Sequence, residues 1–306
     1  MPGGHAQTIF AAFRRPPGIA FERERWDTPD GDFIDLDWAG PTAATRRLVL
    51  FHGLEGSSGS HYARSIASRA LREGWRCVVP HFRGCSGELN RLPRAYHSGD
   101  AAEIDWIMRR LQGLSPATRL DVVGVSLGGN ALLKWLGEQG EAALPVVRHA
   151  AAVSAPLDLT AAGHALGRGF NKVYTRMFLG SLKRKAKEKL RAFPGSFDGS
   201  AMQASRNLYE FDNAVTAPLH GFRDTDDYWA RASSWPLLAG IRVPTLVINA
   251  RNDPFMPESA LAHTRHASPQ VTLEFPAGGG HAGFLSGPFP GTHGWLADRI
   301  FEFFRN

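Results

Sequence analysis

Ser126 is the residue whose setting most strongly suggests nucleophilic chemistry. It lies between Gly124 and Gly128 in the run Gly-Val-Ser-Leu-Gly, after an apolar run and before a helix-forming one. Flanking glycines suit a turn too tight for Cβ atoms, which would hold the hydroxyl out to attack an acyl carbon. A plain glycine-rich bend is the alternative, because chance gives this pattern in about one chain of this length in ten. The position between a strand and a helix favours the nucleophile.

A serine hydroxyl needs a base beside it and an acid that orients the base. For a nucleophile on a strand–helix turn, the acid and then the histidine are expected after later strands. Asp253 lies in the first loop after the apolar run 243–250, and His281 follows the run 271–275 behind three glycines. Ser126, Asp253 and His281 are therefore the predicted catalytic residues.

Two of these assignments have competitors. Asp253 precedes Pro254 and would also serve as an ordinary turn residue. His293 competes with His281 as the base, and it is interpreted instead as opening the last helix. The Gly-Gly-Gly-His setting after the last strand favours His281.

The negative charge that develops during acyl transfer needs backbone N–H groups, each worth about 3–4 kcal/mol. One is expected from Leu127, the residue after the nucleophile. The other is expected from Leu54, in the loop His-Gly-Leu-Glu-Gly that follows the run 47–51. His52 is interpreted as shaping this loop through hydrogen bonds.

The elements that must hold these residues alternate between short apolar runs and helical patterns. Apolar runs without polar alternation indicate parallel strands covered on both faces. We expect such strands at 47–51, 76–80, 119–125, 147–154, 243–250 and 271–275, with edge antiparallel strands at 19–26 and 33–38. Helices are expected at 61–75, 100–113, 129–140 and 293–304. This order predicts an α/β fold with a mostly parallel, doubly wound sheet.

The alternation breaks between about 155 and 238, and we interpret this interval as a helical lid inserted into one domain of residues 1–306. Within it, residues 172–191 carry eight Lys or Arg and one Glu. The apolar residues near helical spacing are Val173, Met177, Phe178, Leu182, Ala186 and Leu190. This spacing predicts a helix packed on the body by one face with its basic face in solvent. Contact of the basic face with an anionic membrane is the alternative.

Composition limits the remaining possibilities. The net charge of the chain is +6, and residues 172–191 alone carry +7, so the rest of the chain is close to neutral. Because the basic charge is confined to one segment, no nucleic-acid partner is expected. No cofactor or metal is expected, because His263 and His266 lack a third ligand in register. Cys77 and Cys85 are too few for a disulfide framework, and no signal-like apolar segment is present. These features predict a cytoplasmic protein.

Several longer stretches resemble the α/β hydrolases, specifically the YheT-like branch that is related to the ABHD lipases and esterases. The resemblance implies a serine hydrolase with a helical lid that acts on small carboxylic esters, as a short-chain carboxylesterase or an acylglycerol lipase. An acyltransferase with the same residues and a non-catalytic binding module stay open as alternatives. The resembling stretches are 3–9, 50–64, 78–100, 124–138, 210–222, 227–233 and 249–255.

Four polar residues in these stretches have no assigned chemistry. His81, Arg83 and Glu88 follow a strand, so they either line the rim of the site or form a buried polar network that supports the lid. Asp212 is interpreted as docking the lid onto the body.

Overall fold

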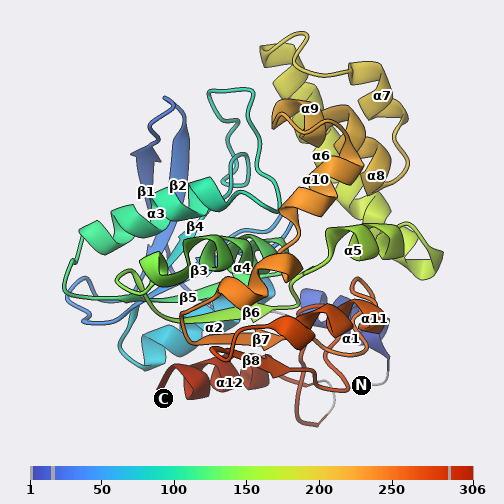
Figure 1. Ribbon diagram of the computed structural model, residues 1–306. Coiled ribbons are helices and arrows are strands. Elements are labelled where there is room, and N and C mark those ends of the chain that lie inside the picture. The colour runs from blue at the N-terminus through green and yellow to red at the C-terminus, as the bar shows by residue number, and fades with distance from the viewer. Residues whose placement is uncertain (1–2, 15–17, 289–290, 306) are drawn as a thin grey trace.

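The computed structural model describes residues 3–14, 18–288 and 291–305. Its centre is an eight-stranded sheet in the order β1-β2-β4-β3-β5-β6-β7-β8 (Figure 1). From β4 onward neighbouring strands are parallel, while β1 pairs antiparallel with β2 and β2 with β4 at one edge. The strands are β1 (Glu22–Asp27), β2 (Phe33–Ala39), β3 (Arg47–Phe51), β4 (Arg76–Pro80), β5 (Leu120–Val125), β6 (Val147–Val153), β7 (Thr245–Ile248) and β8 (Val271–Glu274). The predicted sheet and its antiparallel edge are confirmed.

Helices cover both faces of the sheet, as a doubly wound fold requires. On one face, α3 (Ala101–Gly113) and α4 (Leu127–Gln139) pack their apolar side chains onto strand residues such as Val122. On the other face, α2 (His61–Arg72) and α12 (Gly294–Arg305) pack onto the alternate strand residues, Val123 among them. Successive residues of β5 therefore belong to two separate cores, which explains why Val122 and Val123 are both apolar.

The N-terminal segment forms α1 (Gly4–Phe13), a helix that the sequence did not predict. Shorter elements border the sheet: η1 (Gly140–Ala143), α11 (Glu258–Leu261) and η5 (Ala262–His266). Among the described residues, no helix is long and apolar enough to cross a membrane.

A helical insertion joins β6 to β7, where the sequence predicts the lid. Figure 1 shows its helices, coloured from yellow-green to orange, gathered to one side of the sheet. Leu179, Met202 and Phe211 form part of an apolar cluster of its own. The elements of the insertion are α5 (Leu159–Leu166), η2 (Gly169–Asn171), α6 (Lys172–Ala192), α7 (Gly199–Ala204), α8 (Leu208–Phe211), η3 (Asp212–Thr216), α9 (Ala217–Leu219) and α10 (Thr225–Ala232). The chain then returns to the body through η4 (Trp235–Gly240), which packs on α4.

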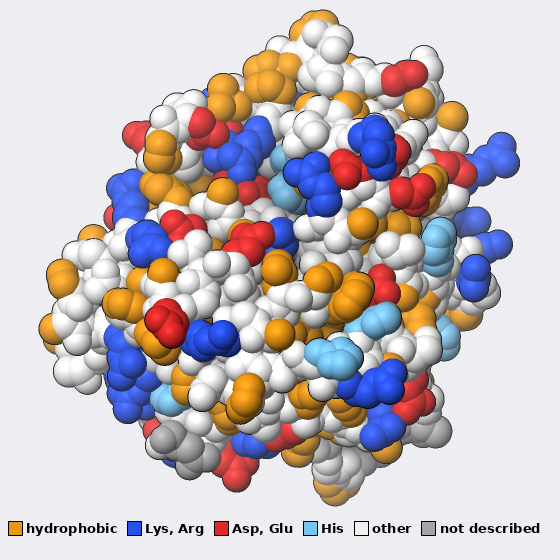
Figure 2. Space-filling model, in the orientation of Figure 1, with side chains coloured by type: hydrophobic (Ala, Val, Ile, Leu, Met, Phe, Trp, Pro, Cys, Tyr) orange, Lys and Arg blue, Asp and Glu red, His pale blue; other side chains and the backbone are white. Residues whose placement is uncertain are grey.

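Charged side chains are distributed without a single dominant patch on the face drawn in Figure 2. Basic, acidic and apolar side chains alternate across that face. This pattern differs from the continuous basic surface that marks a nucleic-acid-binding domain.

Candidate active site

Ser126 occupies the turn between β5 and α4 in a strained backbone conformation, with φ 54° and ψ −120°. A Cβ on Gly124 would lie 2.5 Å from the carbonyl oxygen of Gly128, and one on Gly128 would lie 2.5 Å from that of Phe51. Both flanking positions therefore exclude side chains because α4 begins directly against the strands. Helix α4 starts at Leu127, two residues earlier than predicted, because this close packing overrides the low helix propensity of glycine.

The structure brings the three predicted residues together at the carboxyl ends of the strands. The Nε2 atom of His281 lies 2.9 Å from the Oγ atom of Ser126. The Nδ1 atom of His281 lies 2.9 and 3.2 Å from the two carboxylate oxygens of Asp253, whose side chain is fully buried. Since a carboxylate only accepts, Nδ1 carries the imidazole proton and Nε2 is free to accept the serine proton. This arrangement can generate a nucleophilic serine.

Asp253 is also fixed by its own loop, where it accepts a hydrogen bond of 2.8 Å from the backbone N–H of Phe255. The ring of Phe255 lies against that of His281, with centroids 4.1 Å apart. The competing histidine, His293, lies beside His61 with ring centroids 5.1 Å apart. Within the described part of the chain, the ring that hydrogen-bonds to Ser126 is that of His281, not that of His61 or His293.

Helix α1 supports the histidine loop, a role that sequence reasoning missed. The hydroxyl of Thr8 accepts a hydrogen bond of 2.8 Å from the backbone N–H of His281, and Gln7 accepts one from Gly279. A Cβ on Gly280 would lie 2.6 Å from the carbonyl oxygen of Gly4, so the loop and the helix are in direct contact. The only signal for this role was the family resemblance of residues 3–9, which gave no chemical reason for it.

In the loop after β3, the backbone donors on either side of Leu54 are occupied. Gly53 N–H donates to the Tyr62 hydroxyl at 2.8 Å, Glu55 N–H to the Tyr96 hydroxyl at 3.0 Å, and Gly56 N–H to the Gly53 carbonyl at 2.9 Å. Within the described residues, the N–H of Leu54 has no such partner.

The second predicted donor, Leu127, is the first residue of α4, where backbone N–H groups lack intrahelical partners. A Cβ on Gly53 would lie 3.1 Å from that of Ser126, so the loop after β3 borders the serine. Leu54 and Leu127 line one cavity with Ser126. The two amides are thus available on the serine's side of the site.

His52 shapes this loop, as predicted. Its Nδ1 atom donates to the carbonyl of Gly53 at 2.8 Å, and its Nε2 atom accepts from the N–H of Phe82 at 3.2 Å. Complete burial lowers the pKa of His52 to about 3, so the ring is neutral and holds this pair of hydrogen bonds at physiological pH.

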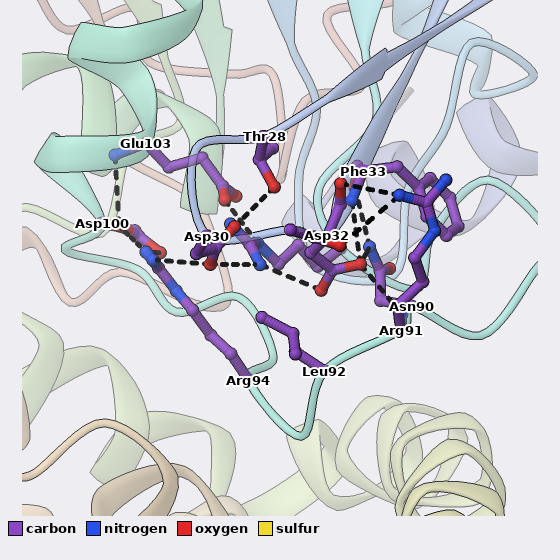
Figure 3. A network of polar contacts seen from close by, with 12 residues as sticks. Thr28, Asp30, Asp32, Phe33, Asn90, Arg91, Leu92, Arg94, Asp100 and Glu103 are labelled. Atoms are coloured by element: carbon purple, nitrogen blue, oxygen red, sulfur yellow. Dashed lines mark hydrogen bonds and ion pairs between the residues drawn. The ribbon is translucent and has the colours of Figure 1, made fainter.

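The side chains after β4 form a buried polar network. His81 hydrogen-bonds to Asp37 at 2.9 Å, and Arg83 donates to Glu103 at 2.6 Å and to Asp32 at 2.9 Å. Figure 3 shows the second group of contacts, in which carboxylates of the β1–β2 turn and the start of α3 converge with Asn90 and Arg94 of the loop after β4. The buried-network interpretation therefore holds for His81 and Arg83.

Glu88 differs from these two residues. Its side chain is 64% exposed, pairs with Arg25 at the surface and lines the cavity that contains Ser126, so the rim interpretation holds for Glu88. Above the same loop, the ammonium of Lys189 in α6 donates to the carbonyls of Leu92 and Arg94 at 2.7 and 2.9 Å. The polar network thus stiffens a loop on which the insertion rests.

The contacts of Asp212 contradict the prediction that this residue docks the insertion onto the body. It accepts hydrogen bonds from Thr216 at 2.6 Å and from the indole of Trp229 at 2.9 Å, and both partners belong to the insertion. Burial raises the pKa of Asp212 to about 6, although these hydrogen bonds oppose the shift. Asp212 therefore joins helices within the insertion, and it lines the cavity that contains Ser126.

A cavity of about 1020 Å³ lies between the insertion and the strand ends. Ser126 and His281 lie in its wall, and most of the remaining lining is apolar, as a site for an acyl chain requires. Its outer part is bordered by Phe13, Val173 and Met177, whose exposed fractions are 82%, 47% and 69%.

Helix α6 buries most of the predicted apolar face. Ala186 is buried, and Phe178, Leu182 and Leu190 pack against apolar clusters as expected. Val173 and Met177, at the start of that face, are exposed instead, while Tyr174 and Leu179 are buried. The lysines also divide: Lys183, Lys185 and Lys189 turn toward the protein and hydrogen-bond to it. The sequence pattern could not separate these lysines from the solvent-facing ones because long side chains reach partners from either flank of a helix.

Comparison with known proteins agrees with this architecture. Residues 46–288 match the family described as the alpha/beta hydrolase fold. The putative esterase YheT of Escherichia coli (strain K12) is 41% identical over 302 residues, which cover 97% of this chain and 88% of that protein. Phospholipase ABHD3 of Mus musculus is 31% identical over 310 residues, covering 97% and 74% of the two chains. Among solved structures, the esterase EaEST from Exiguobacterium antarcticum shares the fold with a TM-score of 0.60 and 18% identity, over 93% of this chain and 100% of that one.

Proposed function

This chain belongs to the α/β-hydrolase family, in its YheT-like branch, and on that premise we propose that it is a serine hydrolase of carboxylic esters. The observation that carries the proposal is the continuous chain of hydrogen-bonding distances from Ser126 through His281 to Asp253. This chain lies in the wall of a large apolar cavity.

The proposed reaction proceeds through an acyl-enzyme. His281 takes the proton of Ser126 as Oγ attacks the ester carbonyl carbon, and Asp253 stabilises the imidazolium. The N–H groups of Leu54 and Leu127 stabilise the tetrahedral oxyanion. The imidazolium then protonates the departing alcohol, and a water molecule, activated by the same histidine, releases the acid and restores Ser126.

The cavity supports an ester with an aliphatic acyl group, as in a short-chain carboxylesterase or an acylglycerol lipase. Its lining includes apolar side chains from α5, α6 and η3 in the insertion, such as Leu166, Phe178 and Val215. We therefore propose that the insertion, about 155–238, is a lid that covers the bound acyl chain. We also propose that the lid and the sheet together form a single domain.

Labelling with a fluorophosphonate probe tests this function. Wild-type protein should become labelled, and Ser126→Ala should not. An unlabelled, folded wild type would favour the non-catalytic binding module. Turnover of p-nitrophenyl esters of increasing acyl length then ranks substrates, and faster product formation with added alcohol than with water alone would favour the acyltransferase.

We also propose that the cavity mouth contacts anionic membrane through the first half of α6. Val173 and Met177 are exposed there beside the basic residues Lys172 and Arg176. Phe13 of α1 borders the same mouth. Apolar side chains among basic ones are the arrangement that binds helices to anionic lipid surfaces. Both cysteines are free thiols, which suits the cytoplasmic location that we propose.

A further inference from the structure

We propose that helix α6 of the insertion positions the oxyanion loop through Glu55, so that Lys185 and Ser181 are positioning residues for ester hydrolysis. The proposal rests on the function proposed above. It extends that function because it connects the seating of the insertion to the geometry of the Leu54 amide.

The backbone at Glu55 is held in an unfavourable conformation directly after the predicted oxyanion donor. Its φ is +56°, in the left-handed region that non-glycine residues seldom occupy. Such strain persists only where surrounding contacts hold it. The N–H of Glu55 donates to the hydroxyl of Tyr96 at 3.0 Å, which fixes one side of the peptide unit that follows Leu54.

The carboxylate of Glu55 is held from two directions. From the body, the hydroxyl of Tyr96 donates to Oε1 at 2.8 Å. From the insertion, the ammonium of Lys185 donates to the same oxygen at 2.9 Å, and the hydroxyl of Ser181 donates to Oε2. Two of the three side-chain groups that hold this carboxylate therefore come from α6, and they lie one helical turn apart.

The Glu55 carboxylate depends on these contacts because its side chain is buried. The Glu55 side chain is only 9% exposed, so removal of Lys185 and Ser181 would leave this carboxylate with Tyr96 as its one side-chain partner among the described residues. A buried charge without a partner is strongly unfavourable. The carboxylate would then turn toward solvent and move the backbone that carries the Leu54 N–H. Seating of α6 over the cavity and completion of the oxyanion site are thus one event.

A direct chemical role for Glu55 is disfavoured by the same contacts. Both of its carboxylate oxygens are occupied by protein donors, whereas a general acid or base needs an oxygen directed at substrate. The catalytic base position is already filled by His281, 2.9 Å from Ser126.

The test compares Lys185→Met, Ser181→Ala and Glu55→Gln in hydrolysis of a soluble p-nitrophenyl ester. We expect kcat to fall about 10–100-fold in Lys185→Met and Glu55→Gln, the range for displacement of a catalytic group by about 1 Å. KM should change little, and affinity for an alkyl boronic acid, which forms a tetrahedral adduct with the serine, should fall with kcat/KM. Lys185→Arg should recover most of the activity. Lys187→Met is the matched control, because Lys187 is exposed on the same helix.

A double variant shows whether Lys185 and Glu55 affect activity through the same interaction or independently. If Lys185 acts through Glu55, then Glu55→Gln with Lys185→Met should lose no more activity than the worse single variant. Additive losses, unchanged kcat, or a raised KM with normal kcat would each overturn the proposal. Circular dichroism and thermal unfolding identify a misfolded variant, in which case Ser181→Ala, which removes one hydroxyl, decides by the same kcat and boronic-acid criteria. If Ser126 of the wild type is not labelled by fluorophosphonate, the proposed function itself fails, independently of these variants.

Discussion

The Nε2 atom of His281 lies 2.9 Å from the Oγ atom of Ser126, although 155 positions separate the two residues in the chain. The fold achieves this by ending β5 and β8 at the same edge of one parallel sheet. The imidazole and the hydroxyl can therefore exchange a proton without rearrangement of the backbone.

Loss of either residue should abolish most turnover. We expect Ser126→Ala and His281→Ala each to lower kcat by about 10⁴–10⁶-fold, with little effect on KM. Because the two groups act as a unit, the double variant should be no worse than either single one. Steady-state kinetics on a p-nitrophenyl ester measures this. Additive losses in the double variant would show that the two residues do not act together.

Thr8 should matter for activity although it lies far from the nucleophile in the sequence. Thr8→Val removes the acceptor for the His281 backbone N–H, and an unsatisfied buried donor costs about 1–3 kcal/mol. We expect a lower melting temperature and about a tenfold lower kcat, because the histidine loop is no longer fixed. Thr8→Ser keeps the hydroxyl and should behave as wild type. Equal activity of the valine and serine variants would contradict this role.

The sequence predicted the three residues that we propose to react, and the structure places them together, but the sequence predicted few of the residues that hold them in place. Ser126, Asp253 and His281 could be predicted because each follows a strand, and strand ends have local signals in apolar runs and glycines. The contacts of Thr8 with His281 and of Lys185 with Glu55 join positions 273 and 130 residues apart. No local pattern encodes such pairs.

Helix α6 shows a second limit of sequence reasoning. Its amphipathic pattern predicted both the helix and its packed apolar face, but that face is only partly buried. Tyr174 and Lys189 are buried, while Met177 is 69% exposed. Burial of Lys189 depends on two backbone carbonyls, of Leu92 and Arg94, which become neighbours only in the folded protein.

The steric requirement for glycine beside Ser126 can be tested by comparison with a glycine whose position has room for a side chain. In Gly128→Ala the new Cβ would meet the carbonyl oxygens of Phe51 and His52 at 2.5 Å. We expect the free energy of unfolding to fall by about 1–3 kcal/mol, with loss of activity as the loop after β3 shifts. Gly180→Ala in α6 meets no atom within 4 Å and should gain about 0.5–1 kcal/mol. Urea unfolding compares the two, and a tolerated Gly128→Ala would refute the steric requirement.

Stability should depend on pH through Asp212. Burial raises its pKa to about 6, so the folded state retains a proton that the unfolded state releases above pH about 4. The resulting stabilisation is present below that pH and is lost as pH rises through about 6. Asp212→Asn cannot titrate, so its free energy of unfolding relative to wild type should increase between pH 4 and 7, by about 1–3 kcal/mol.

Asp30 provides the opposite control for this measurement. Burial would raise its pKa, but hydrogen bonds from Thr28 and Arg83 lower it to about 2. Its stabilisation is therefore lost only as pH falls toward 2. Asp30→Asn should be destabilised by a constant amount between pH 4 and 7. A pH-independent difference for Asp212→Asn, measured by urea unfolding in the same buffers, would show that Asp212 is ionised in the folded protein.

If the protein contacts membrane, its binding to vesicles should depend on the exposed residues Phe13, Val173 and Met177 at the cavity mouth. Wild-type protein should co-sediment with vesicles containing anionic lipid and less with neutral vesicles, since each basic residue near an anionic surface contributes about 1 kcal/mol. Met177→Glu places a negative charge on a side chain that is 69% exposed, and it should weaken binding without lowering turnover of a soluble ester. Leu114→Glu alters another exposed apolar residue, 55% exposed, that does not line the cavity, and it should leave binding unchanged. Equal and negligible binding of the wild type to both kinds of vesicle would eliminate membrane contact, and equal losses in the two variants would place it elsewhere than the mouth.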